Sequence, residues 1–148
     1  MKAERPYPQV HITQKGERAL TAGHPWVYAA EVTELSGPVE DGGLADVIGH
    51  KGAYLGTGFY NSHSLIRCRL LSRNANDRFD DAFWQRRVQY AWDYRKAVMP
   101  PEDLHCCRVI FGEADGFPGL TVDRFGPVLV VQVLSLGMEH IQDRLLPI

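Results

Sequence analysis

The amino-acid sequence predicts an α+β protein in which a small β-barrel is followed by a second module of helix and strands. Up to residue 72, short apolar runs alternate with turn-forming residues at a spacing typical of a small barrel. After the polar stretch 72–77, apolar residues recur at helical spacing and three strand-like runs follow. We therefore predict one domain over residues 1–72 and a second over residues 73–148.

The first domain is predicted as short strands around one brief helix. In chain order we expect a strand over 9–12, one or two helical turns over 15–21, an apolar run that starts at 26–28 and continues through 32–35, a hairpin of 45–48 and 53–60, and a strand over 65–71. Gly56 and Gly58 indicate a bulge or a close backbone approach within the hairpin.

The second domain is predicted to begin with a helix. Asp80 or Asp81 can cap it, its apolar residues recur at helical spacing through Val98, and the two prolines at 100–101 end it. Strands are then expected over 106–111, 120–125 and 128–134, and a last helix begins at Met138. The Gly-Pro pair at 126–127 predicts that the last two strands form a hairpin.

The composition is that of a folded cytoplasmic protein. Of the 148 residues, 45% are hydrophobic and 10% aromatic, which is enough to build a packed core and argues against intrinsic disorder. No run approaches the roughly 18 apolar residues of a membrane span, so we expect no membrane partner. Three cysteines, two of them adjacent, make no disulfide framework and indicate a reducing compartment.

The charge distribution favours the first domain as the site of any polyanion contact. The net charge is −2, but residues 1–73 hold eight Lys and Arg against seven Asp and Glu. Arg67 and Arg69 lie two residues apart on a predicted strand, so both point to one face, about 7 Å apart. Two guanidinium groups at that separation can grip neighbouring phosphates of a nucleic acid. A solvated strand face with salt bridges is the alternative, and the spacing alone leaves both open.

A sharp turn at residues 23–26 displays an imidazole and an indole. His24 is the expected exposed contact, with Lys15 and Arg18 as basic neighbours, since aromatic and basic groups together suit unstacked bases. Trp26 is predicted to be a core anchor.

Other groupings carry weaker signals. Glu113, Asp115 and Asp123 bracket a turn-rich run, but their spacing matches no calcium loop, and aspartates in turns often cap their own backbone. Adjacent Cys106 and Cys107 point to opposite faces of a strand, which argues against zinc. No glycine-rich nucleotide-binding or phosphate-binding motif occurs.

Several longer motifs resemble a known family. Residues 23–28 (GHPWVY), 55–61 (LGTGFYN) and 64–69 (SLIRCR) are similar to the N-terminal PUA domain of the RlmI-like large-subunit ribosomal RNA methyltransferases. The segments 83–95 and 112–126 (GEADGFPGLTVDRFG) are similar to the central domain that follows it. The similarity extends over about residues 10–139.

The resemblance implies a PUA-like, RNA-binding β-barrel over 1–72 and a central domain over 73–148 that is truncated. Family members continue into a Rossmann-like domain that binds S-adenosylmethionine and carries the cysteine that attacks cytosine to give 5-methylcytosine. We expect that catalytic domain to be absent from this chain, so no catalytic, cofactor-binding or metal-binding residue is assigned. S-adenosylmethionine is the cofactor of the full-length family only.

The predicted function is to position an RNA substrate, expected to be large-subunit ribosomal RNA, before a methyltransferase domain. The predicted RNA contacts are the basic and imidazole side chains together with two residues of a neighbouring loop: Lys15, Arg18, His24, Asn61, Ser64, Arg67 and Arg69. The alternatives are a free-standing RNA-binding adaptor without catalysis and, more weakly, a hydrolase using Glu113 and Asp115. We also expect self-association through residues 120–148, because a truncated domain would expose apolar surface.

Overall fold

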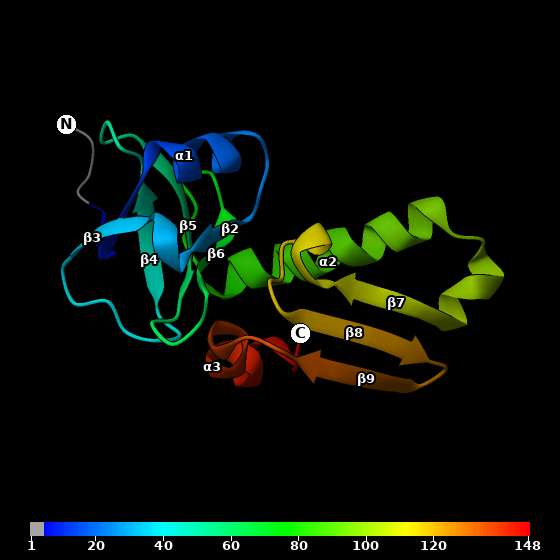
Figure 1. Cartoon of the computed structure of the whole chain (residues 1–148). Helices are drawn as coiled ribbons and strands as arrows, with labels where there is room; N and C mark the ends of the chain where they lie inside the picture. The colour runs from blue at the N-terminus through cyan, green and yellow to red at the C-terminus, as the bar shows by residue number, and fades with distance from the viewer. Residues whose placement is uncertain (1–4) are drawn as a thin grey trace. The chain divides into compact units, whose positions relative to one another are not determined.

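The computed structural model describes residues 5–148, which form two compact units (Figure 1). The division between the units falls after Ala75, inside the polar stretch expected to be a linker. The predicted boundary lies three residues earlier. None of the helices described is long and apolar enough to cross a membrane.

The first unit is a curled six-stranded sheet with the order β2-β6-β5-β4-β1-β3 (Figure 1). Neighbouring strands are antiparallel except β1 and β4, which are parallel. The elements are β1 (Gln9–Ile12), α1 (Gln14–Thr21), β2 (Trp26–Tyr28), the 3₁₀ turn η1 (Ala29–Glu31), β3 (Val32–Ser36), β4 (Leu44–Ile48), β5 (Tyr54–Tyr60) and β6 (Ile66–Ser72). This arrangement confirms the predicted mixed fold with a barrel-like first part.

The core of this unit is built from alternate residues of its strands. Val10, Val27, Val47 and Cys68 are fully buried and pack in one cluster with Leu20 of α1. Burial raises the pKa of the Cys68 thiol to about 12. This thiol is therefore protonated at neutral pH, which disfavours it as a nucleophile and supports a packing role.

Gly58 confirms the expected close approach of two strands. A Cβ atom there would overlap the carbonyl oxygen of Arg69 on β6, so a side chain cannot be accommodated. The register between β5 and β6 also shifts between Thr57 and Gly58, as a bulge would produce.

One expectation for the first unit is wrong: the apolar run from Trp26 does not continue through residues 32–35 as one strand. The 3₁₀ turn η1 interrupts it, and the carboxylate of Glu31 accepts a hydrogen bond from the backbone N–H of Tyr28 at 2.9 Å. As a result β2 pairs with β6 at one edge of the sheet, while β3 pairs with β1 at the other.

The second unit confirms the predicted order of helix and strands. It contains α2 (Asp81–Val98), the 3₁₀ turn η2 (Pro101–His105), β7 (Cys106–Phe111), the 3₁₀ turn η3 (Gly112–Asp115), β8 (Leu120–Phe125), β9 (Val128–Val133) and α3 (Leu136–Leu145). Asp80 caps α2, because its carboxylate accepts the Phe83 N–H at 2.9 Å. The strands form an antiparallel sheet in the order β7-β8-β9. No doubly wound parallel sheet occurs among residues 5–148.

Strand β9 is the edge of this sheet and exposes apolar side chains. Val128, Leu129 and Val130 are 55%, 59% and 50% exposed, and Leu134 just after the strand is 65% exposed. Charged residues are a usual protection of an exposed edge strand, and β9 carries none. Self-association through residues 120–148 stays a prediction, and this edge is the surface that motivates it.

Candidate nucleic-acid interface

The predicted arginine pair lies on β6 beside the short edge strand β2. Trp26 stands directly opposite Arg69, and the guanidinium carbon of Arg69 lies 5.2 Å from the centre of the Trp26 ring. Directly opposite residues in a sheet place their side chains on the same face. Val27 and Cys68, one position along, both point into the core. Arg67 and Arg69 therefore occupy the face opposite the core.

Three aromatic side chains gather on this edge. The ring centre of His24 lies 5.8 Å from that of Trp26 and 5.7 Å from that of Tyr28, and the Trp26 and Tyr28 centres are 6.4 Å apart. Tyr28 is 39% exposed, while His24 and Trp26 are half-buried. We call the surface formed by His24, Trp26, Tyr28, Arg67 and Arg69 the β2–β6 surface.

The expectation that Trp26 is a core anchor is wrong. The sequence predicts this side chain as a core anchor, but Val27 takes that position and Trp26 lies on the outer face against Arg69. In a strand of three residues, the alternation buries one position and exposes the two beside it. The indole is thus part of the candidate interface.

Arg67 also orders the loop that precedes β6. Its guanidinium donates hydrogen bonds to the carbonyl oxygens of Ser62 and of Ser64, the latter at 2.6 Å. The side-chain oxygens of Asn61 and Ser64 accept backbone N–H groups of His63 and Ile66 at 2.9 and 3.1 Å. Asn61 and Ser64 therefore shape the loop, and their amide and hydroxyl protons are the groups that could donate to RNA.

Asp41 anchors the same loop from outside. Its carboxylate accepts the backbone N–H and the hydroxyl of Ser62 at 2.5 and 2.8 Å, and these hydrogen bonds lower the pKa of Asp41 below its ordinary value. The loop is thereby held in one shape next to Arg67.

The other two predicted contacts lie on α1. Lys15 and Arg18 are exposed, and within residues 5–148 their side chains make no hydrogen bond or ion pair. Arg18 lines a cavity of about 380 Å³. Arg73, which no sequence motif singles out, connects α1 to the β2 edge by donating to the carbonyl oxygens of Leu20 at 2.7 Å and His24 at 3.1 Å.

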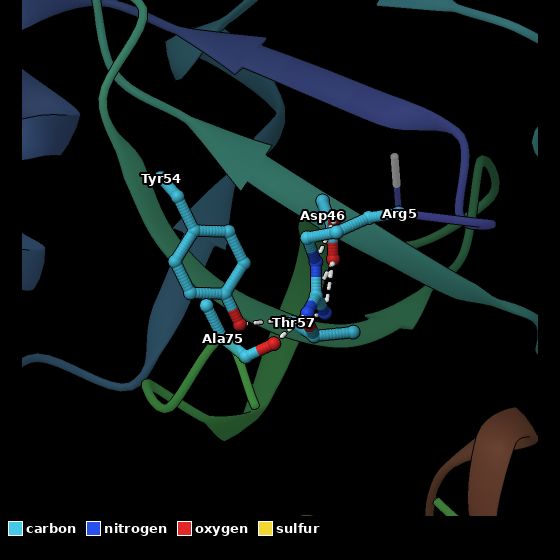
Figure 2. Close-up of polar contacts among 5 residues, drawn as sticks. All are labelled: Arg5, Asp46, Tyr54, Thr57 and Ala75. Atoms are coloured by element: carbon cyan, nitrogen blue, oxygen red, sulfur yellow. Dashed lines mark hydrogen bonds and ion pairs between the residues drawn. The ribbon is translucent and has the colours of Figure 1, made fainter. Parts of the chain in front are cut away.

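A buried polar cluster supports this unit from within (Figure 2). The guanidinium of Arg5 donates to both carboxylate oxygens of Asp46, at 2.7 and 3.1 Å, and to the hydroxyl of Thr57 at 2.9 Å. It also reaches the carbonyl oxygen of Ala75, and its carbon lies 4.8 Å from the centre of the Tyr54 ring. Asp46 and Thr57 are 1% and 0% exposed, so their role is structural. The sequence signal that could have identified Asp46 is a lone aspartate in an otherwise apolar strand.

Asp115 and Asp123 of the second unit are engaged in structural contacts. Arg95 donates to both carboxylate oxygens of Asp115, at 2.6 and 3.2 Å, and Asp115 also accepts the Phe111 N–H at 2.7 Å. Asp123 pairs with Arg108 at 2.8 Å. No cluster of three or more potential metal ligands occurs in the part of the chain described. The ion pair and hydrogen bonds of Asp115 are structural contacts and give the hydrolase alternative no support.

Comparison with known proteins gives consistent results. Residues 10–73 match the model of a PUA-like domain. Over 134 residues, which are 90% of this chain, the sequence is 36% identical to ribosomal RNA large subunit methyltransferase I of Klebsiella pneumoniae subsp. pneumoniae and 37% identical to that of Salmonella typhi. The aligned part is 34% and 33% of those two proteins, so the chain spans about one third of their length.

Solved structures agree on the fold. A protein of Streptococcus mutans assigned as a methyltransferase dependent on S-adenosylmethionine superposes with a TM-score of 0.78 over 94% of this chain and 36% of its own. A second structure, solved in complex with SAH, gives the same values. Sequence identity is 16% in both cases, so this likeness establishes the shared fold alone.

Proposed function

We propose that this chain binds RNA and positions it for methylation. It corresponds to about one third of the length of the ribosomal RNA large subunit methyltransferases I that it resembles. The observation that carries the proposal is the β2–β6 surface within the PUA-like residues 10–73. There two arginines share one outer face with three aromatic rings.

The chemistry of the surface suits RNA. Guanidinium groups bind phosphate oxygens through forked, charge-assisted hydrogen bonds, and they remain charged at every physiological pH. Aromatic rings beside them can stack on bases that are not paired. Arg69 is already oriented by the Trp26 ring, and Arg67 by two carbonyl oxygens, so little side-chain entropy would be lost when RNA binds.

Replacing both arginines, Arg67→Ala with Arg69→Ala, is expected to weaken binding to large-subunit ribosomal RNA. The slope of log K against log salt concentration should fall by about 0.7 to 0.9 for each phosphate that an arginine no longer neutralises. The measurement is a titration of labelled RNA at several salt concentrations. Because Arg67 also holds the 61–65 loop, the single variant Arg69→Ala should give about half of the change with that loop intact.

The control for this experiment removes two exposed arginines elsewhere. Arg78 and Arg86 belong to the second unit and are exposed. The variant Arg78→Ala with Arg86→Ala changes the net charge equally and should leave the slope near the wild-type value. If the two double variants lose affinity equally, binding depends on net charge alone and the β2–β6 surface has no special role.

We further propose that this chain alone binds no S-adenosylmethionine and transfers no methyl group. Such cofactors bind beyond the carboxyl ends of parallel strands, against a glycine-rich turn that opens a helix. The parallel pair among residues 5–148 is β1 with β4, and the segment after β1 leads into α1 through Thr13 without a glycine-rich turn. These residues do not fit the cofactor. Calorimetric titration with S-adenosylmethionine should give no saturable heat, whereas saturable binding would contradict the assignment.

A further inference from the structure

A cavity of about 380 Å³ opens between α1 and the turn that joins β4 to β5. The lining residues come from one helix and one turn: Gln14, Glu17, Arg18, Thr21, Ala22 and His50. Small-molecule sites in proteins range upward from about 300 Å³, so the volume lies at the lower end of that range.

One wall of the cavity is a fixed carboxylate. The Oε2 atom of Glu17 accepts the backbone N–H of His50 at 3.0 Å and also contacts Nδ1 of the His50 ring. The side-chain hydrogen bond with His50 lowers the pKa of Glu17 below its ordinary value. Gly49 is required for this contact, since a Cβ atom there would lie 2.6 Å from Glu17 Oε2. The other carboxylate oxygen, Oε1, accepts no hydrogen bond from residues 5–148.

Arg18 lines the cavity, and Lys15 and Lys51 directly follow the lining residues Gln14 and His50 in the chain. Lys15, Arg18 and Lys51 are exposed, and within the described chain their side chains make no hydrogen bond or ion pair. Lys51 is near enough to favour the ionised form of Glu17. The cations favour a phosphate at the rim, whereas the Glu17 carboxylate repels an anion inside and can accept a hydrogen bond from a base amino or imino group.

We propose that this cavity binds one unpaired nucleotide of the RNA, with its base inside against Glu17 and Gln14 and its phosphate at Lys15, Arg18 and Lys51. The proposal rests on the proposed function and adds to it a preference for RNA with an extruded nucleotide. A paired base cannot enter, because its hydrogen-bonding edge is occupied by its partner.

The test uses two RNA hairpins that differ only in whether one 2-aminopurine is bulged or paired. Wild-type chain should bind the bulged hairpin about tenfold more tightly, which corresponds to one well-formed base contact, and the fluorescence of the bulged base should change on binding. Ala22→Leu fills the cavity without changing charge and should abolish both the preference and the fluorescence change. Ala30→Leu, at an exposed position outside the cavity lining, should preserve both.

The outcomes separate this inference from the proposed function. If both hairpins bind equally and Ala22→Leu has no effect, the cavity is not a nucleotide site, while RNA binding by the β2–β6 surface stands. If neither hairpin binds at any salt concentration, the proposed function itself fails. If the preference persists in Ala22→Leu, the bulged nucleotide is recognised elsewhere and the inference is overturned.

Discussion

Replacing Arg95 or Asp115 with alanine is expected to lower the free energy of unfolding of the second unit by about 3 to 5 kcal/mol. The side chains of the two residues are 10% and 9% exposed, and the guanidinium meets the carboxylate through two hydrogen bonds. Arg95 also donates to the carbonyl oxygen of Arg108 on β7 at 2.7 Å. Either substitution leaves one buried charge without an oppositely charged partner, and this is the costly change. Urea denaturation with peptide-resolved hydrogen exchange measures the decrease in stability.

A matched control lies on the same helix. Lys96 and Asp93 form an ion pair at 2.7 Å, but their side chains are 46% and 50% exposed. Removing that pair with Lys96→Ala should cost no more than about 1 kcal/mol, because water and salt screen it. Equal decreases for Arg95→Ala and Lys96→Ala would mean that the buried pair has no special role in the second unit.

The second large effect is expected at Arg5. The variant Arg5→Ala should destabilise the first unit by about 3 kcal/mol, at the lower end of the range for a broken buried pair because Arg5 itself is 23% exposed. The reason is that Asp46, at 1% exposure, would keep one hydrogen bond from Thr57 and lose the two from Arg5. Hydrogen exchange of β4 and β5 peptides is the appropriate measurement.

Two further variants make the test specific, one at this cluster and one at an exposed ion pair of the second unit. Arg5→Lys retains the positive charge but cannot form the forked contact with Asp46, so an intermediate destabilisation is expected. Arg144→Ala removes the ion pair between Arg144 and Asp81. The two side chains are 49% and 76% exposed, so stability should change little. Stability of Arg5→Ala within about 0.5 kcal/mol of wild type would contradict the role assigned to the cluster in Figure 2.

Local sequence patterns predicted those elements that carry their own helix, strand or turn signal. Helix α2 followed from its apolar spacing and a capping aspartate, and β8 and β9 followed from two apolar runs around a Gly-Pro turn. The junction of β2 and β3 lacked such a signal. Its 3₁₀ turn consists of two alanines and Glu31, residues that do not mark a turn by themselves.

Contacts between distant residues account for the rest. The Arg5 and Asp46 pair joins residues 41 apart in the chain, and nothing in the sequence connects them. Alternation in β2 puts Trp26 and Val27 on opposite faces, but it does not tell which of the two faces the core; the pairing of β2 with β6 decides that. In the candidate site, the spacing of Arg67 and Arg69 predicted a shared face, whereas the cavity formed with His50 needed the fold to bring α1 and the β4–β5 turn together.

The most direct test of RNA binding by the β2–β6 surface is a map of the RNA contacts on the intact chain. The chain is crosslinked to large-subunit ribosomal RNA with ultraviolet light, and mass spectrometry identifies the crosslinked peptides. Such crosslinks form preferentially at aromatic side chains that touch bases. We predict crosslinks in the β2 peptide that contains Trp26 and Tyr28 and in the loop before β6, and their disappearance in Arg67→Ala with Arg69→Ala. Crosslinks confined to residues 76–148, or none at any salt concentration, would contradict RNA binding at this surface.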